Sequence, residues 1–297
     1  MHKTRLVTLS LIAVAIGATA IYVLSSRRPP EPAPAPPPGN SSTAGTVAEV
    51  REVREALLKE LKTVTLKNCR LKRYGGTGAG DQADIGGYLM CENLAAGIQT
   101  AYSYGIAGED SWGCQVSREF GVTVHQYDCF NDDRPSCDGG HFVFHDECVG
   151  PKAETIDKRP FDTIPSQVVR NGDAGKVLLM KIDVEGAEWD SFLSAQDSVF
   201  EQIDQLDVEF HHVEDPKYID TLRRLKRFFY IAHVHYNNFS CDPALRPFPS
   251  WAFEVLLVNK RIAMTDGSPA SAGPAGVDAA NNPSWPDCQA PRGVPVL

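Results

Sequence analysis

The chain has 297 residues, of which 42% are hydrophobic and 23% are charged, a composition typical of a globular protein with one substantial core. Its formal net charge of −9 means that its average field repels polyphosphate. The body of the chain also lacks Lys and Arg clusters interleaved with aromatic residues, so we expect no nucleic acid partner.

The N-terminal 26 residues predict a membrane anchor. Residues 6–24 read LVTLSLIAVAIGATAIYVL, which is 19 residues without a formal charge. A spanning helix needs about 20 apolar residues, whereas the apolar region of a cleaved signal has about 7–15. Length therefore favours an uncleaved signal anchor over residues 1–26. A cleaved signal is the alternative, because Ala18–Ala20 resembles a cleavage site.

Three further segments flank the predicted domain. Residues 27–45 are rich in proline and predict an extended polyproline stalk. Residues 46–64 place apolar residues at helical spacing and predict an amphipathic helix; the pattern covers too few heptads to favour a self-associating stem. Residues 263–297 are rich in Gly, Ala, Pro and Ser and predict a poorly ordered tail, with Cys288 as a point of attachment.

Eight cysteines indicate an oxidising compartment. No two of them form a CxxC pair, so a zinc knuckle or a thioredoxin-type motif has little support. We expect disulfides in a lumenal or extracytoplasmic body on a single-pass membrane anchor, with reduced buried cysteines as the alternative. The sequence determines neither their pairing nor the oligomeric state. The sequons at Asn40 and Asn238 agree with such a location.

Between residues 65 and 262 the chain alternates apolar strands with amphipathic helices. This alternation predicts an α/β, Rossmann-like fold with a mostly parallel sheet covered on both faces. The last two strands are joined by a proline-rich connection that is too irregular for a crossover helix, so we expect an antiparallel pair at one edge. The predicted strands are 100–106, 122–128, 141–147, 176–184, 205–212, 230–238 and 251–260, and the predicted helices are 110–121, a short one within 161–172, 188–203 and 216–229.

Polar and glycine residues gather where the predicted strands end, which is where ligands bind in open α/β sheets. Gly105 and Gly108 follow one strand and precede a helix, a spacing that lets a ligand approach the backbone. Asp128 ends the next strand, about 20 residues after the glycine turn, as expected for an acid that binds ribose hydroxyls. Asp183 and Glu185 follow the later strand 176–184. Glu188 and Asp190 begin the next predicted helix, and we expect them only to stabilise its N-terminus, where the helix dipole favours carboxylates.

The segments IGGYLMCENL, AYSYGIAGEDSWGCQVSREFGVTVHQYD and LLMKIDVEGAEWDSF resemble the methyltransferase-like-24 type of S-adenosylmethionine-dependent methyltransferase domain, a relative of the FkbM-type sugar O-methyltransferases. The resemblance covers about residues 65–262, and KIDVEGAEW is its most specific part. It implies a class I methyltransferase fold of seven strands with the last pair antiparallel. One departure is Ser103, which stands where such domains carry an acid for the amino group of the cofactor.

The resemblance implies S-adenosylmethionine as cofactor. The methionine half would approach the glycine turn, the ribose would meet Asp128, the adenine would meet the segment from His145 to Cys148, and Asp183 would lie between the sulfonium and the acceptor. The implied cofactor-binding residues are Tyr104, Gly105, Ile106, Gly108, Asp128, Cys129, His145, Asp146 and Asp183.

Transfer to a hydroxyl requires a base, and the candidates are Asp183, Glu185, His211 and His235, all predicted near strand ends. Tyr88 is a further candidate for a functional aromatic residue. The segments EFHH (209–212) and HVHY (233–236), and Asp183 with Glu185, offer the ligand types of a divalent metal site. Without a defined spacing they are weak evidence, so we expect no metal and keep a divalent metal as the less favoured alternative.

We therefore expect an S-adenosylmethionine-dependent methyltransferase that acts on a small-molecule or glycan hydroxyl, with the membrane contacted only through the N-terminal helix. The alternative from another class is a catalytically silent, membrane-anchored binding domain of the same fold. A nucleotide-sugar or NAD-binding enzyme on a similar sheet is a third possibility, which the incomplete glycine fingerprint disfavours.

Overall fold

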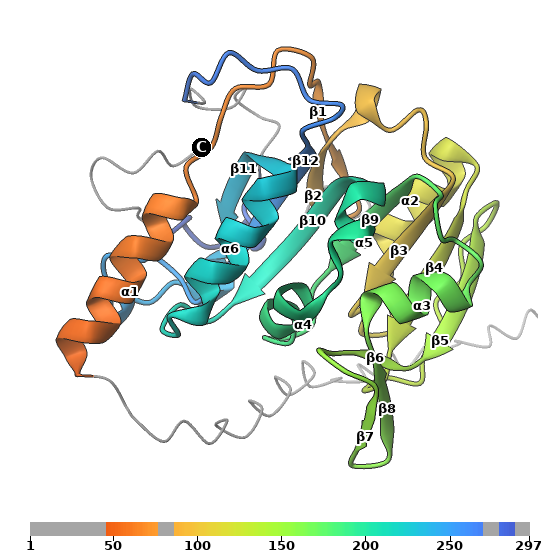
Figure 1. The fold of residues 1–297 in the computed structure, drawn as a ribbon, viewed down its shortest axis with the longest axis horizontal. Coiled ribbons are helices and arrows are strands. Elements are labelled where there is room, and N and C mark those ends of the chain that lie inside the picture. The colour runs from red at the N-terminus through yellow and green to blue at the C-terminus, as the bar shows by residue number, and fades with distance from the viewer. Residues whose placement is uncertain (1–45, 77–85, 270–278, 289–297) are drawn as a thin grey trace, which may run out of the picture. The chain divides into compact units, whose positions relative to one another are not determined.

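The computed structural model describes residues 46–76, 86–269 and 279–288 (Figure 1). The predicted anchor (1–26) and stalk (27–45) lie outside these residues, as does the sequon at Asn40. Among the described helices, none combines the length and the apolar character needed to cross a bilayer.

The described part of the chain contains one seven-stranded sheet, in the order β11-β12-β10-β9-β3-β4-β5 (Figure 1). The five strands from β5 to β10 run parallel, and β12 is antiparallel to both of its neighbours. The predicted α/β class with a mostly parallel sheet is confirmed, and so is the antiparallel pairing of the last two strands at one edge. The bounds are β3 Thr100–Tyr104, β4 Thr123–Asp128, β5 His141–Asp146, β9 Leu178–Ile182, β10 Ile203–His211, β11 Phe229–Tyr236 and β12 Ala252–Asn259.

Helices cover both faces of this sheet. Residues from all the α-helices except α2 share one large core with the sheet, whereas α2 packs on the opposite face. The bounds are α1 Val47–Glu60, α2 Ser111–Phe120, α3 Ile164–Arg170, α4 Glu188–Ser194, α5 Asp197–Gln202 and α6 Lys217–Phe228, with short 3-10 turns at Glu92–Leu94, Asn238–Ser240 and Pro243–Leu245. Helix α1 lies within the predicted segment 46–64, and Thr46 and Glu49 form a capping box at its start.

The single helix predicted over 188–203 is wrong, because the structure has two short helices, α4 and α5, in its place. The chain is extended at Ala195 and Gln196. Arg224 of α6 donates to the carbonyl of Ala195 and to Asp197 at the start of α5. The guanidinium thus satisfies backbone and carboxylate oxygens at the break, which a periodicity argument does not detect.

Two small sheets were not predicted, since their strands are too short to show a clear period. Strands β1 (Leu71–Tyr74) and β2 (Tyr88–Cys91) pair antiparallel and pack over the α2 face of the main sheet. Strands β6 (Cys148–Val149), β7 (Glu154–Ile156) and β8 (Arg159–Asp162) form the second small sheet.

The expected disulfides are present as four pairs, and no cysteine of the described chain is left over. They join Cys69 to Cys91, Cys114 to Cys137, Cys129 to Cys148, and Cys241 to Cys288. Cys288 lies in the predicted tail, and its disulfide attaches residues 279–288 to the segment after β11.

The asparagine of the second sequon, Asn238, is buried in this fold. Asn238 is 3% exposed, its amide donates to the carbonyls of Asn282 and Trp285, and its side-chain oxygen accepts from the backbone N–H of Asn282. The folded protein therefore presents no accessible amide for a glycan at Asn238.

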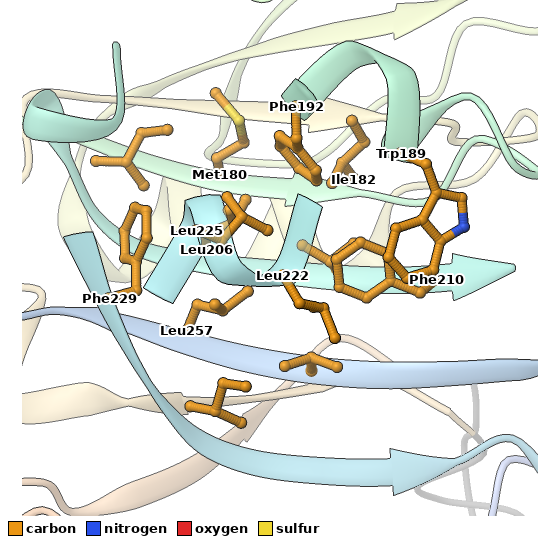
Figure 2. Close-up of a cluster of buried hydrophobic side chains, with 14 of the residues drawn as sticks. Met180, Ile182, Trp189, Phe192, Leu206, Phe210, Leu222, Leu225, Phe229 and Leu257 are labelled. Carbon is orange, nitrogen blue, oxygen red and sulfur yellow. The ribbon is translucent and has the colours of Figure 1, made fainter. Parts of the chain in front are cut away.

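The main core lies between the sheet and helices α4 and α6. Figure 2 shows Phe192 and Trp189 from α4, and Leu222 and Leu225 from α6, against Phe210 of β10. The rings of Trp189 and Phe210 stack with their centroids 4.1 Å apart. This apolar face fixes the position of β9 and β10, and thus of the polar residues on their other face.

Core and surface valines provide a matched test of this packing. Val208 is fully buried in β10, whereas Val169 in α3 is 64% exposed. Val208→Ala should lower the free energy of unfolding by about 2 kcal/mol, because it removes buried methyl groups and leaves a cavity. Val169→Ala should cost nothing measurable, since alanine is the better helix former. Chemical denaturation of both variants checks this, and an equal loss in both would contradict the assigned core.

Candidate functional site

One face of the central strands carries charge although it is buried. All nine residues of β10 are buried, and every second side chain, away from the apolar core, is polar: Gln205, Asp207, Glu209 and His211. The strand register places Glu254 of β12 beside Glu209 and Lys181 of β9 beside Asp207. Buried charges that are not needed for packing mark a candidate site. Sequence reasoning noted Glu209 only within the segment EFHH and missed Asp207 and Glu254, although the period-two spacing of Asp207 with Glu209 in β10 was a usable signal.

The glycine turn contacts the end of β9. Gly105 has a φ of +71°, and a Cβ built on it would overlap the carbonyl oxygen of Asp183. The backbone N–H of Asp183 donates to the carbonyl of Tyr104 over 3.1 Å. Gly105 is therefore required by the close approach of two strand ends, a more direct reason than the approach of a ligand.

Lys181 forms a hydrogen bond with the same glycine turn. It is 7% exposed, and its Nζ donates to the carbonyl of Gly105 over 2.7 Å and lies 3.4 Å from Oδ2 of Asp183. The hydroxyl of Tyr88 donates to the same Oδ2 over 3.2 Å. Asp183 is thus oriented by a phenol and an ammonium group at the carboxyl edge of the sheet.

Asp128 lies at the same edge but is occupied by the backbone. Its Oδ2 accepts from the N–H groups of Ile106 and Ala107, and its Oδ1 accepts from those of Phe130 and Asn131. A carboxylate has about four acceptor sites. Asp128 therefore organises the loops after β3 and β4 here, and ribose hydroxyls would have to replace some of these donors.

His211 connects the strand end to helix α4. Its Nδ1 lies 3.1 Å from Oε1 of the fully buried Glu188, while its Nε2 lies 3.7 Å from both Asp183 and Glu185. Burial lowers the pKa of His211, but the hydrogen bond and charge of Glu188 and the charges of Glu209 and Asp183 outweigh it and raise the pKa to about 10. An imidazolium at neutral pH cannot act as a general base, so Asp183 is the better candidate.

Burial raises the pKa of two carboxyl groups of β10 above the ordinary range. Burial, followed by the charge of Asp183, raises the pKa of Glu209 to about 8, and Asn237 donates to its Oε1 over 2.7 Å. Burial also raises the pKa of Asp207, to which Trp112 Nε1 donates over 3.2 Å.

A cavity of about 220 Å³ opens beside Lys181. It lies between the start of α2, where Asp110 caps the N–H of Gly113, and the ends of the paired strands β1 and β2. Burial raises the pKa of the Asp110 carboxyl. The lining residues are Gly76, Gly87, Tyr88, Glu109, Asp110, Ser111, Trp112 and Lys181.

The structure thus brings together at one edge Gly105, Ile106, Gly108, Asp128, Asp183, Glu185 and His211. Gly108 belongs to this group because a Cβ there would meet Asn131 and Asp133 of the loop after β4. Asp146 lies at the exposed end of β5 and pairs in register with Asp128 of β4. Strand β4 therefore lies between Asp146 and the strand β3 that leads to Gly105.

Four other predicted site residues are not brought to this group. Tyr104 and His145 lie on the opposite face of the sheet, where each stacks on Tyr127. Cys129 is bonded to Cys148. His235 lies on the edge strand β11, and strands β12 and β10 separate it from β9, which leads to Asp183. Its Nε2 is 2.9 Å from Oδ1 of Asn281.

Three of the residues at the charged face have the donor types of a metal site. One carboxylate oxygen each from Asp183 and Glu209, and a ring nitrogen of His211, lie within 4.8 Å of one another. The sequence offered Asp183, and Glu209 with His211 in the segment EFHH, as metal-ligand types without a defined spacing, and the pairing of β9 with β10 supplies that spacing.

The chain matches no model of a known protein family, and no curated protein matches it.

Two glycine variants can distinguish the steric effect of the Gly105–Asp183 contact from the strain of a positive φ alone. Gly121 also has a positive φ, +67°, but a Cβ there would meet nothing within 4 Å. Gly121→Ala should therefore cost about 1–2 kcal/mol. Gly105→Ala should cost clearly more, because the backbone of β9 must also move. Denaturation of the two variants measures the difference, and equal costs would mean that the strand ends are not in contact.

His145 predicts a pH dependence of stability. Burial, and then the charges of His125 and Arg170, lower its pKa from 6.5 to about 4. The unfolded chain therefore takes up a proton before the folded one, and stability is lost as the pH falls from about 6.5 to about 4. His145→Phe keeps a ring beside Tyr127 but cannot titrate. Its free energy of unfolding should fall less than that of the wild type over this range; parallel profiles would contradict the assignment.

Proposed function

We propose that the protein is an S-adenosylmethionine-dependent methyltransferase that methylates a hydroxyl group of a sugar or another small molecule. The strand order supports the finer assignment to the class I methyltransferase fold, since the resemblance implies seven strands with a reversed final pair and the sheet has this form.

The observation that carries the proposal is the contact of three distant segments at one edge. Gly105 abuts Asp183, and Asp128 binds the backbone of the same glycine turn at Ile106. In open α/β sheets this edge is where ligands bind. Three segments chosen from the sequence for cofactor chemistry therefore share one location.

The cavity beside Lys181 fits the amino-acid end of the cofactor. At about 220 Å³ it is smaller than the roughly 300–1,000 Å³ of complete small-molecule sites, so the nucleoside would lie outside it, toward Asp128. The start of α2 and Lys181 would hold a carboxylate. Asp110 and Glu109 would hold an amino group, a role that Ser103 cannot fill.

The protein has to align the acceptor and take up its proton. When bound, S-adenosylmethionine supplies a methyl group on an already reactive sulfonium. Asp183, oriented by Tyr88 and Lys181, is the base that we assign. Trp251 is 42% exposed and its ring centroid lies 6.1 Å from that of His211, so it offers a flat surface for an acceptor ring.

We extend the proposal to the location of the protein, with the body in an oxidising lumen or extracytoplasmic space and an anchor at residues 1–26. The four disulfides support the oxidising compartment, since such bonds are rare in the cytosol.

One observation favours the second candidate, a binding domain of the same fold without turnover. Both oxygens of Asp128 are taken up by backbone N–H groups, which leaves the ribose without a ready acceptor. Such a domain would bind S-adenosylmethionine weakly and transfer nothing.

Calorimetry and methyl transfer distinguish these candidates. The wild type should bind S-adenosylmethionine in preference to NAD and nucleotide sugars, and should transfer labelled methyl groups to a fractionated glycan extract. Asp183→Asn should reduce transfer by at least about 100-fold, with the cofactor affinity within about threefold of the wild type. His235→Gln, a matched change at a candidate that the fold sets apart, should retain transfer to within about threefold.

Preference for NAD or a nucleotide sugar would overturn the proposal. Cofactor binding without transfer to any fraction would favour the silent domain.

A further inference from the structure

Neighbouring strand ends place two carboxylates and an imidazole around one point. Glu209 and His211 project from the same face of β10, and Asp183 follows the adjacent parallel strand β9. Their three donor atoms lie within 4.8 Å of one another. Around a cation with bonds of about 2.1 Å, ligand atoms lie at most about 4.2 Å apart, so small side-chain rotations are enough to close the set.

The orientation of His211 is a second, independent observation. Its side chain is 4% exposed and its Nδ1 is bonded to Glu188, yet its Nε2 makes no hydrogen bond with any described residue. Glu188 is itself fixed, since it accepts from the backbone N–H groups of His211 and Gly186. A histidine that binds a metal usually directs its other ring nitrogen to such a carboxylate.

The local charge balance also favours a cation. Carboxyl groups of five residues gather here, namely Asp183, Glu185, Glu188, Glu209 and Glu254, of which Glu254 also accepts from the amide of Asn281. Lys181 is directed mainly to the carbonyl of Gly105. In a buried site an uncompensated carboxylate is costly, and a divalent cation would neutralise two of them. The carboxylates of Asp183 and Glu185, each 3.7 Å from Nε2 of His211, would attract a cation placed between them and the ring.

We propose that Asp183, Glu209 and His211 bind one divalent cation of the Mn²⁺ type. Two carboxylate oxygens and one imidazole nitrogen suit a metal between the oxygen-preferring Mg²⁺ and Ca²⁺ and the nitrogen-preferring Zn²⁺. Three protein ligands leave coordination positions open on the side of the partly exposed Asp183 and Glu185.

The open positions suggest a role, which rests on the proposed function. A hydroxyl oxygen bound to a divalent cation loses its proton more readily. The cation would therefore favour acceptors that offer an oxygen ligand, and the hydroxyl proton would pass to the carboxylate oxygen of Asp183 that does not bind the cation. The cation site itself does not depend on this role.

Titration of the full-length, chelator-treated chain with Mn²⁺, followed by electron paramagnetic resonance, tests the site without any cofactor. We expect one bound ion per chain, with the ¹⁴N coupling of a coordinated imidazole in the pulsed spectrum. Glu209→Gln should weaken binding by at least about 10-fold. Asp207→Asn, a matched change on the same face of the same strand, should stay within about threefold of the wild type.

The ¹⁴N coupling is read on the wild type, so the test survives a variant that fails to fold. Lack of stoichiometric binding, lack of the coupling, or equal weakening by the two variants would overturn the proposal. Displacement of Mn²⁺ by an equal concentration of Ca²⁺ would also overturn it, because that result indicates an all-oxygen site without His211. Loss of S-adenosylmethionine binding would leave all these results unchanged.

Discussion

The burial of charge on one face of β9 and β10 is the constraint on which the site depends. Asp207, Glu209 and His211 are almost completely withdrawn from water, and transfer of an unpaired charge into such an environment is unfavourable. The opposite face of the same strands, with Leu206, Val208 and Phe210, supplies the hydrophobic packing that outweighs this cost. The fold can therefore hold functional groups on one face because the other face stabilises the strands.

The two faces are linked through helix α4. Glu188 lies at the start of this helix and positions His211, while the next residue, Trp189, packs in the apolar core and donates from Nε1 to the carbonyl of His211. The aromatic core and the orientation of the imidazole thus depend on the same turn of helix. The acidic segment KIDVEGAEWD serves both, since Asp183 and Glu185 face the open edge and Glu188 holds the buried histidine.

Much of the fold could be predicted from the sequence, because the main strands are either rich in apolar and aromatic residues or alternate them with polar ones, as in β10, and most helices between them have a clear period. The break at Ala195 could not, since it depends on Arg224, a contact from another helix. At the site, Gly105, Asp128 and Asp183 were identified by their place after strands. The set of Glu209 with His211 and Asp183 was not, because spacing within a strand says nothing about which strand lies beside it. The sequence also did not show on which face of the sheet the side chain of His145 lies, because that depends on the register of β5 with β4.

The central claim is that the buried carboxylates serve a ligand and do not hold the fold together. The free energy of unfolding of Glu209→Gln, compared with the wild type in the presence of chelator, tests this most directly. The substitution keeps the shape and an acceptor for Asn237 but removes a carboxyl group crowded by Asp183 and Glu254. The account predicts that the variant is at least as stable as the wild type. A loss of more than about 1 kcal/mol would contradict it, because such a loss would assign the carboxylate a structural role.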